Sequence, residues 1–172
     1  ESNYNEEMAK FSRDLAISLR ASSVLEIGCS SGNDLKLFPK DSDVNGIDQS
    51  DFAIGLAQKN LDSFKFKVAS PTSIPYDDSS FDFVFTRNLL NYVENIDVEK
   101  TLNEMYRVSK KYILNIERFT PNEQPLDDEP VSSWGRNIQN RWMNFKVKII
   151  SNVDMHEEID PKKSRFTLVR KI

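Results

Sequence analysis

The sequence predicts an α/β domain built on a mostly parallel sheet of seven strands, with helices on both faces and an antiparallel last strand. Short apolar runs alternate with segments of helical periodicity, which is typical of strands joined by crossover helices. The run 81–86 is nearly all apolar and is therefore expected to be a central strand. The final two apolar runs are joined by a short connection, which favours an antiparallel return at the end of the sheet.

The expected elements alternate along the chain. Residues 4–20 carry apolar side chains on roughly one face, so a leading helix is expected there. Ser50 is the expected N-cap of a helix that ends at Leu61. The polar segments 71–80 and 119–129 are expected to be loops. Strands are expected at 23–27, 44–48, 64–69, 81–86, 112–116, 145–150 and 165–172, and further helices at 32–37, 98–108 and 132–142.

Length and composition indicate a single domain that spans residues 1–172. The chain is 38% hydrophobic and 29% charged, as is usual for globular proteins. Its net charge of −4 argues against nonspecific binding to nucleic acid or to an anionic membrane, because no basic surplus is present to neutralise phosphates. Neither a signal peptide nor a membrane-spanning segment is expected, because no apolar run approaches the length needed to span a bilayer.

The single cysteine, Cys29, and the single histidine, His156, limit the redox and metal chemistry of the chain. One cysteine forms no intrachain disulfide, so a cytoplasmic location is expected. One cysteine and one histidine do not give a zinc site, and no metal is expected. Whether the protein is a monomer or a homodimer stays open at this point.

The most informative segment is 24–33, in which an apolar run ends in an acid and continues into a turn of small residues. The next apolar run ends in another carboxylate, Asp48. If the two runs are adjacent strands, Glu26 accepts a hydrogen bond from an amino group and Asp48 accepts two from a vicinal diol. Gly28 and Gly32 keep the turn free of side chains, so that a ligand lies against the backbone.

Two other classes of protein share part of this pattern. Gly28-x-Ser30-x-Gly32 matches the nucleophile elbow of serine hydrolases, but that fold needs several strands before the elbow and too few residues precede it here. A triad would also depend on His156. The NAD-binding fingerprint fails because its third glycine would fall at Asn33. An ordinary strand–helix turn explains the two glycines but not the pair of acids.

With these residues, the segment resembles motif I of the class I S-adenosylmethionine-dependent methyltransferases, usually acid-x-Gly-x-Gly-x-Gly. Ser30 stands where the family has its middle glycine, and Asp48 stands at the place of its ribose-binding acid. The resemblance implies the Rossmann-like fold of that family, with S-adenosylmethionine as cofactor and S-adenosylhomocysteine as product. The cofactor-binding residues that it implies are Glu26, Gly28, Cys29, Ser30, Gly32, Asp48, Gln49, Ser70, Thr72 and Thr86.

A second resemblance to this family runs through the loop after the third expected strand. From Ile74 the chain reads Ile-Pro-Tyr-Asp-Asp-Ser-Ser-Phe-Asp, close to the family's Leu-Pro-Phe-x-x-x-Ser-Phe-Asp. The acid that family members often use against the adenine amino group corresponds to Ser70, which is uncharged. A serine oxygen or a backbone carbonyl still accepts that hydrogen bond, although more weakly than a carboxylate.

Candidates for the chemistry follow the fourth and fifth expected strands. The segment 86–93 resembles the family's methyl and acceptor side, where Tyr92 either binds an acceptor hydroxyl, acts as a weak base or walls the pocket. A base is needed only for a hydroxyl or a protonated amine, and the candidates are Glu117, Tyr92 and His156. Arginines and tryptophans suit an anionic or carbohydrate-like acceptor, and equally a lid helix packed by its tryptophans. Candidate substrate-binding residues are Asn88, Asn91, Arg118, Trp134 and Arg136.

The sequence therefore predicts methyl transfer from S-adenosylmethionine to a small polar acceptor, with a sugar or a sugar acid among the candidates. A loose resemblance of 112–121 and the Trp134 region to methylases of pseudaminic acid biosynthesis points to the sugar acid. The alternative is a cofactor-binding or nucleotide-binding interaction module without catalysis, favoured by Ser30, Ser70 and the lack of an obvious base. Methylation of nucleic acid is disfavoured because no Asn-Pro-Pro-aromatic motif follows the fourth strand.

Overall fold

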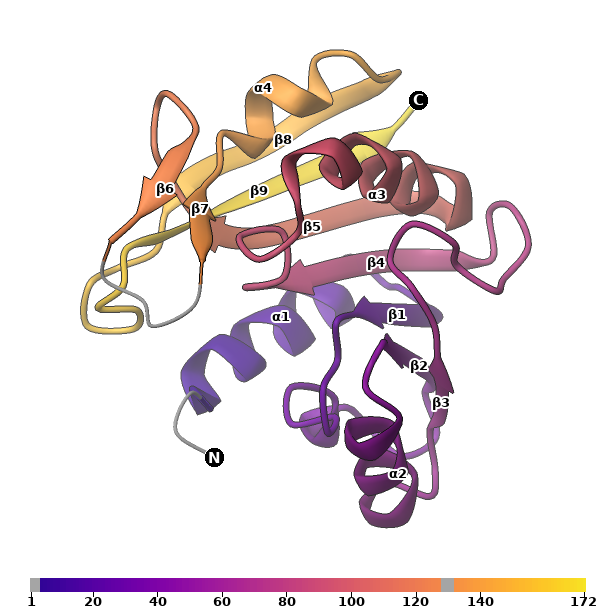
Figure 1. Ribbon diagram of the computed structural model, residues 1–172. Coiled ribbons are helices and arrows are strands. Elements are labelled where there is room, and N and C mark those ends of the chain that lie inside the picture. Colours follow the sequence, from indigo (N-terminus) through magenta and orange to yellow (C-terminus); the bar gives the residue numbers. More distant parts are fainter. Residues whose placement is uncertain (1–3, 128–131) are drawn as a thin grey trace.

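The computed structural model describes residues 4–127 and 132–172, and it confirms the expected sheet of seven strands (Figure 1). The strand order is β3-β2-β1-β4-β5-β9-β8. The first five strands run parallel, whereas β9 lies antiparallel between β5 and β8. The strands are β1 (Ser23–Ile27), β2 (Asp43–Asp48), β3 (Lys65–Val68), β4 (Phe81–Arg87), β5 (Ser109–Arg118), β8 (Val147–Asp154) and β9 (Ser164–Lys171).

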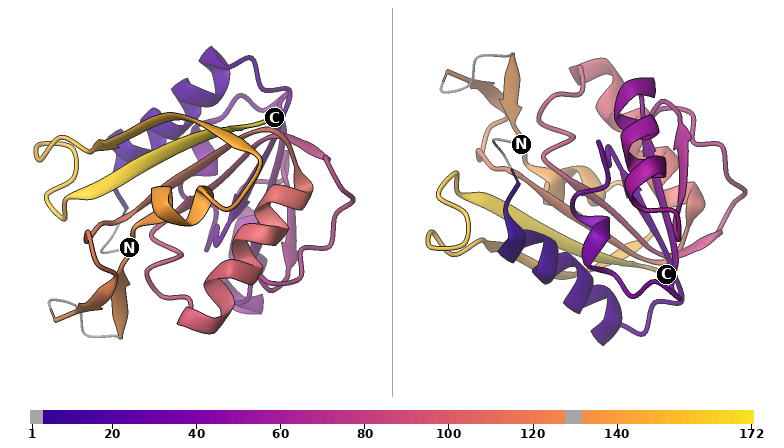
Figure 2. Two further views of the ribbon diagram at one scale, coloured as in Figure 1. Left: turned by 90° about the horizontal axis from the view of Figure 1, so that it is seen from above. Right: turned by 90° about the horizontal axis from the view of Figure 1, so that it is seen from below.

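Helices cover both faces of this sheet, and α1 and α3 lie on opposite sides of it (Figure 2). The helical elements are α1 (Glu6–Ser18), the 3₁₀ turn η1 (Leu35–Leu37), α2 (Asp51–Asn60), α3 (Asn95–Val108) and α4 (Ile138–Trp142). Alternate residues of a strand point to opposite faces. Phe83 and Phe85 accordingly join the core under α1 and α2, while Val84 joins the core under α3 and α4. All three side chains are fully buried, as expected of a central strand.

Side chains fix the start of two helices. Asn5 Oδ1 accepts a hydrogen bond from the Met8 N–H, and Ser50 Oγ accepts one from the Ala53 N–H, each at 3.2 Å. Such a cap stabilises a helix by about 1 kcal/mol. The Ser50 cap confirms the expected start of α2, and it places the first turn of that helix directly behind the end of β2.

The chain after β5 differs from the prediction. The residues 124–126, expected in a loop, form β6 (Gln124–Leu126), which pairs antiparallel with β7 (Ser133–Gly135) in a second, two-stranded sheet. The expected helix over 132–142 is wrong in its first part, and α4 occupies only its end. Pairing with β6 and a hydrogen bond from the Trp134 N–H to the Asn91 carbonyl, at 2.8 Å, keep this segment extended. Residues 128 and 129 of the expected loop lie outside the described residues.

The expected helix over 32–37 is also shorter than predicted. Only Leu35–Leu37 form a single 3₁₀ turn, and the residues before it continue the turn that follows β1. Leu35 is fully buried, so this turn packs against the core although it does not build a full helix. In the part of the chain that the structure describes, no helix is long and apolar enough to cross a membrane.

The topology places one crevice at the carboxyl edge of the parallel strands. The chain leaves β1 toward β2 on one side, whereas it leaves β4 toward β5 on the other. The strand order therefore reverses between β1 and β4, and open α/β sheets bind their ligands at such a place. The turn after β1 and the loop after β4 are consequently the segments where a functional site is expected.

Candidate functional site

Two cavities open at the carboxyl edge of the sheet. The smaller measures about 290 Å³ and lies among the ends of β1, β2 and β3 and the segment 89–97. The larger measures about 600 Å³ and lies among the turn after β1, the end of β4, the N-terminal segment and the turn 160–162. Gly28 and Tyr92 line both cavities, which makes the two cavities neighbours with shared walls.

The turn after β1 is tight and lies directly on β2. Gly28 has φ +78°, a left-handed conformation that glycine adopts without strain. A Cβ atom at Gly28 would lie 2.8 Å from Leu89 Cδ1, so Leu89 fills the space that a side chain would need. The N–H groups of Gly28 and Cys29 donate to the Ile47 carbonyl at 2.8 and 3.0 Å. The backbone at the mouth of the cavities is therefore fixed before any ligand binds.

Asp48 joins this turn to the start of α2. Its Oδ2 accepts the Ser30 N–H and its Oδ1 accepts the Ser50 N–H, both at 2.9 Å. Ser30 has φ +49°, in the left-handed region that favours glycine, which explains why related motifs have glycine there. Asp48 also lines the smaller cavity. Each carboxylate oxygen accepts more than one hydrogen bond, so Asp48 keeps acceptor capacity for a ligand.

Glu26 is a buried carboxylate in the wall of the larger cavity. The residue is only 3% exposed, and its Oε2 has no hydrogen-bond partner among the described residues. Burial raises the pKa of Glu26 well above its ordinary value, and the negative charge of Asp34 raises it further. A buried carboxylate without partners is costly, so this oxygen suits a donor supplied by a ligand, above all a cation.

The polar end of the smaller cavity consists of three predicted cofactor residues. Gln49 Nε2 donates to Ser70 Oγ at 3.3 Å, and Ser70 Oγ and Thr72 Oγ1 lie 2.8 Å apart. All three residues line the cavity, together with the apolar residues Ala69, Pro71, Leu89 and Val93. The cavity thus combines apolar walls with a few hydroxyl and amide groups, as sites for planar heterocycles do.

Two other predicted cofactor residues are held in the turn by packing. Cys29 lines the larger cavity, but burial raises the pKa of its thiol, which therefore stays protonated. Gly32 lines neither cavity: a Cβ atom there would lie 2.7 Å from Leu61 Cδ1, next to Phe66. Gly32 accordingly serves the packing of the turn against α2 and β3.

Glu117, a predicted base, lies at the end of β5 but in the protein interior. It is 2% exposed and lines neither cavity. Its carboxylate accepts the Thr86 hydroxyl at 2.8 Å and the N–H groups of Leu89 and Asn91 at 3.4 Å. Burial raises the pKa of Glu117 to about 7, although these hydrogen bonds lower it. In this structure the Glu117 carboxylate thus holds the loop after β4 and does not reach either cavity.

Thr86, a predicted cofactor-binding residue, likewise lies in the interior. Its hydroxyl donates to Glu117 and accepts the Asn115 Nδ2 donor at 2.8 Å, and Asn115 Oδ1 in turn accepts the Trp142 Nε1 donor at 2.8 Å. The Thr86 side chain is fully buried in this chain of hydrogen bonds and lines neither cavity. It therefore supports Glu117 and does not meet a cofactor in the cavities.

The loop after β4 forms the wall between the two cavities. Asn88 has φ +52° and lines the larger cavity, as expected of a candidate near the acceptor. Tyr92 is 45% exposed and lines both cavities. Asn91 is instead buried: its amide nitrogen donates to the carbonyls of Arg118 and Trp134 at 3.2 and 2.6 Å. Asn91, a predicted substrate-binding residue, thus holds the loop against β5 and β7. The loop residues that line the cavities are Asn88 and Tyr92.

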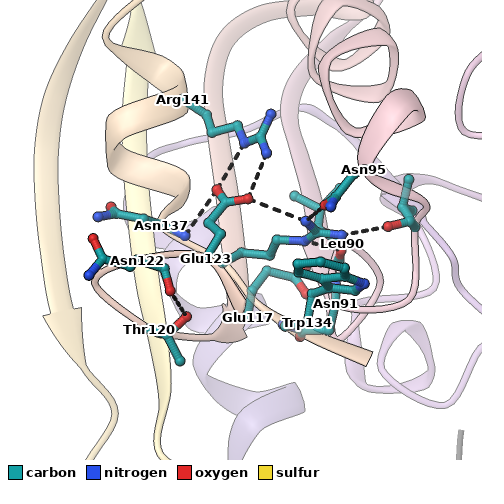
Figure 3. A network of polar contacts seen from close by, with 12 residues as sticks. Leu90, Asn91, Asn95, Glu117, Thr120, Asn122, Glu123, Trp134, Asn137 and Arg141 are labelled. Carbon is teal, nitrogen blue, oxygen red and sulfur yellow. Dashed lines mark hydrogen bonds and ion pairs between the residues drawn. The ribbon is translucent and has the colours of Figure 1, made fainter. Parts of the chain in front are cut away.

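Arg136 lies inside the protein and binds no substrate there. It is 1% exposed, and its guanidinium donates to the carbonyls of Leu90 and Val93 at 3.0 and 2.6 Å. It also hydrogen-bonds Asn95 and forms an ion pair with Glu123 at 3.2 Å. Arg141 pairs with the same Glu123 carboxylate (Figure 3). Through these contacts Arg136, a predicted substrate-binding residue, joins the loop after β4 to the β6–β7 hairpin and lines neither cavity.

The remaining predicted residues lie in different places. Arg118, a candidate substrate-binding residue, lines the larger cavity. Trp134 is half-buried under the Arg136 guanidinium, 5.2 Å from its ring centre, and lines neither cavity. His156 is 64% exposed in the turn after β8, outside both cavities, and its Nδ1 accepts the Glu158 N–H at 3.3 Å. The predicted base His156 is therefore a surface residue in this structure.

Several residues of the larger cavity were not predicted from the sequence. Asp34, Arg87 and Asp160 line it and are all largely buried. Arg87 ends β4, so its position at a strand end was a usable signal. Tyr4 and Asp160 come from opposite ends of the chain, and no local pattern marks them.

Comparisons with known proteins agree with this architecture. A family model described as a methyltransferase domain matches residues 24–112, which is more than half of the chain. The uncharacterized methyltransferase YcgJ of Bacillus subtilis (strain 168) is 26% identical over 113 residues. These cover 61% of this chain but only 44% of YcgJ, so the match spans less than half of that protein.

Two solved structures show the same fold at low sequence identity. A SAM-dependent methyltransferase from Methanosarcina mazei superposes with a TM-score of 0.73 at 21% identity, covering 87% of this chain and 92% of that one. Magnesium protoporphyrin IX methyltransferase from Synechocystis PCC 6803, solved with bound SAH, gives a TM-score of 0.74 at 12% identity, covering 96% and 82%. The Rossmann-like class I methyltransferase fold expected from the sequence is thereby confirmed. Because this family model runs from β1 into the first residues of β5, over more than half of the sequence, the chain belongs to the methyltransferase domain family.

Proposed function

We propose that the protein transfers a methyl group from S-adenosylmethionine to a small polar acceptor. The observation that carries this proposal is the pair of carboxylates at the ends of two neighbouring strands, Glu26 and Asp48, on either side of Gly28. Glu26 offers a buried oxygen without a partner to the methionyl ammonium. Asp48 offers its remaining lone pairs to the ribose hydroxyls.

The smaller cavity fits the adenine ring. Its walls are apolar where Ala69, Pro71, Leu89 and Val93 meet, and Ser70 provides a hydroxyl at its polar end. Adenine needs such a flat apolar slot with few hydrogen-bonding groups. Ser70 replaces the carboxylate that relatives often place there, so a neutral hydrogen bond serves the exocyclic amine in this protein.

The part of the larger cavity away from Glu26 is the proposed acceptor side. Asn88, Tyr92 and Arg118 line it beyond the turn after β1, so the acceptor meets amide, phenol and guanidinium groups. These groups favour a polar molecule with hydroxyl or acidic groups, such as a sugar or a sugar acid. Trp134 and Arg136 were also predicted to bind the acceptor. They contribute to this side only by holding the loop after β4 in position.

S-Adenosylmethionine supplies a methyl group made electrophilic by its positive sulfur, and the protein has chiefly to align and shield the reactants. Gly28 brings the backbone of the turn close to the ligand, and Tyr92 stands at the junction of both cavities. The predicted bases Glu117 and His156 lie outside the cavities. A carboxylate or a neutral amine is nucleophilic without losing a proton and needs no base, whereas a hydroxyl acceptor leaves Tyr92 as the predicted base that lines the cavities.

A second candidate function is cofactor binding without catalysis. The position of Glu117 in the interior favours it, because the best-placed carboxylate after β5 is used to hold a loop. Such a protein would bind S-adenosylmethionine without transferring its methyl group and would act as an interaction module. The two candidates share the cofactor site and differ only in turnover.

Isothermal titration calorimetry with S-adenosylhomocysteine tests the shared site. We expect Glu26→Gln and Asp48→Ala to lower the affinity about 10- to 100-fold, because each removes a charge-assisted hydrogen bond. Asp43→Asn is the matched control, since Asp43 lies at the far end of β2 and pairs with the exposed Lys65. Unchanged affinity in Glu26→Gln and Asp48→Ala would refute the proposed site.

Turnover then separates enzyme from binding module. A panel of sugars, sugar acids, amines and phenols is incubated with S-adenosylmethionine, and release of S-adenosylhomocysteine is measured. Release that depends on a polar acceptor and is lost in Tyr92→Ala supports the methyltransferase. Tight cofactor binding without release on any acceptor class supports the second candidate.

A further inference from the structure

Arg87, the last residue of β4, is a largely buried cation in the wall of the larger cavity. Its side chain is 13% exposed, and that of its partner Asp34 is 3% exposed. Arg87 Nη2 donates to Asp34 Oδ1 at 2.8 Å, and Arg87 Nε donates to Asp34 Oδ2. This two-point pair fixes the guanidinium in one orientation.

The fixed orientation leaves one terminal nitrogen of the guanidinium unused. Asp34 occupies the edge formed by Nε and Nη2, whereas Nη1 makes no hydrogen bond to any residue that the structure describes. Arg87 also forms part of the cavity wall. A ligand in the cavity therefore has access to a cationic donor that is already aligned.

The Arg87 guanidinium and the Glu26 carboxylate belong to the wall of one cavity. Both residues line the same cavity, and their strands pair side by side. The positive charge of Arg87 lowers the pKa of Glu26, against the larger effects of burial and of Asp34, which shows that the two groups are within electrostatic reach. A cationic donor beside an anionic acceptor complements a ligand that carries a carboxylate and an ammonium on adjacent atoms. That arrangement is the end of an α-amino acid.

We propose that Arg87, braced by Asp34, binds the carboxylate of the methionyl part of S-adenosylmethionine while Glu26 binds its ammonium. The inference rests on the proposed function and adds a binding residue to it. Asp34 has a definite part: it neutralises a cation that would otherwise be buried without a partner. It also removes the rotamer freedom that a free arginine would lose when the ligand binds.

Three ligands that differ only at this end of the molecule test the inference. S-Adenosylhomocysteine carries both charged groups, decarboxylated S-adenosylhomocysteine keeps only the ammonium, and 5′-deoxy-5′-methylthioadenosine carries neither. Their dissociation constants are measured by calorimetry for the wild type, for Arg87→Met and for Glu26→Gln. Lys65→Met, which removes an exposed cation far from the cavities, is the matched control.

We expect Arg87→Met to weaken S-adenosylhomocysteine about 10- to 100-fold, the loss of one charged hydrogen bond. The same variant should bind the decarboxylated ligand and methylthioadenosine as the wild type does. This result also shows that the variant is folded. Glu26→Gln should weaken both ligands that carry the ammonium, and Asp34→Asn should weaken S-adenosylhomocysteine less than Arg87→Met does.

Three results would overturn the inference, and they are distinguishable. Wild-type affinity of Arg87→Met for S-adenosylhomocysteine would make the ion pair purely structural. An equal loss for all three ligands would mean that Arg87 shapes the cavity without contacting the carboxylate. In both cases the proposed function would stand. If the wild type bound neither S-adenosylhomocysteine nor methylthioadenosine, the proposed function would fail together with the inference.

Discussion

The polar residues at the ends of β1 and β2 and those at and after the end of β5 have opposite roles in the same fold. Glu26 and Asp48 face the cavities and keep hydrogen-bonding capacity for a ligand. Glu117 and Arg136 turn inward and bind the loop after β4 through its backbone. The difference teaches that an acid at the end of a central parallel strand does not by itself mark a ligand site. The role of such an acid depends on whether a neighbouring loop presents backbone N–H groups that need a hydrogen-bond acceptor.

The largest effect that would sharpen this contrast is expected at Arg136. Arg136→Met removes the donor to two backbone carbonyls and leaves Glu123 with the ion pair to Arg141 and the hydrogen bond from the Asn137 N–H. Breaking such a buried pair lowers the free energy of unfolding by about 3–5 kcal/mol. Urea denaturation at neutral pH measures the loss.

Arg141→Met is the matched control for Arg136, because Arg141 pairs with the same carboxylate but is 28% exposed. A partly exposed pair contributes about 1 kcal/mol or less. Equal losses in the two variants would contradict the role of Arg136 in holding this loop, since the backbone carbonyls of Leu90 and Val93 would then contribute nothing.

Glu117 gives the next effect, which depends on pH. Burial raises the pKa of its carboxyl from about 4.5 to about 7, so the folded chain holds this proton more tightly than the unfolded chain. The stability from this group is therefore complete below about pH 4.5 and is lost as pH rises to about 7. We expect the difference in stability between wild type and Glu117→Gln to change by about 3 kcal/mol across this window, in favour of the variant at the higher pH.

Denaturation of both proteins at several values between pH 4.5 and 8 tests this dependence. Glu26 also has a raised pKa, and the comparison with Glu117→Gln removes its contribution because both proteins carry it. Stability curves that stay parallel throughout would show that Glu117 does not titrate in this range. The interior position assigned to it would then be doubtful.

Gly28 belongs to the other region of the comparison, the turn after β1 that lines the cavities. Gly28→Ala introduces a Cβ atom 2.8 Å from Leu89 Cδ1 at φ +78°. Left-handed strain of this kind costs about 1–2 kcal/mol, and we expect weaker binding of S-adenosylhomocysteine as well. Thermal denaturation and calorimetry measure the two effects.

Gly55→Ala is the control for Gly28, since it lies in α2 with nothing within 4 Å of an added Cβ atom. It should stabilise the protein by about 0.5–1 kcal/mol, because alanine is favoured in helices, and leave binding unchanged. A Gly28→Ala variant that gained stability in the same way would refute the tight packing of the turn.

The smallest effect is expected at His156. Its side chain is 64% exposed and lines neither cavity, so His156→Ala should change stability by less than about 0.5 kcal/mol. Cofactor affinity and turnover should equal those of the wild type. A turnover that fell at least tenfold with unchanged cofactor affinity would instead return His156 to the reaction.

The sheet and the turn after β1 were predictable from local patterns. Buried strands are short apolar runs, and the positions of Glu26, Gly28 and Asp48 follow from two parallel strands, the first of which ends in a tight turn. The Ser50 cap was equally local. Such features depend on residues close in sequence, whose periodicity and turn chemistry are visible in one chain.

The acceptor side was less predictable because its contacts are distant in sequence. Arg136 binds the carbonyls of Leu90 and Val93, 46 and 43 residues earlier, and no side-chain pattern records a partner that is backbone. The strands β6 and β7 have three residues each, too short for a reliable period. Tyr4 and Asp160 meet in the larger cavity only because the sheet brings the two ends of the chain together.

The contact of Leu89 with Gly28 has a consequence for engineering. Leu89 belongs to the loop that separates the cavities, and it rests on the glycine that opens the cofactor turn. Substituting residues of this loop to admit a new acceptor is therefore expected to disturb the proposed binding site of the nucleoside as well. Variant libraries that aim at acceptor preference have to randomise both segments jointly and be screened for cofactor affinity at the same time.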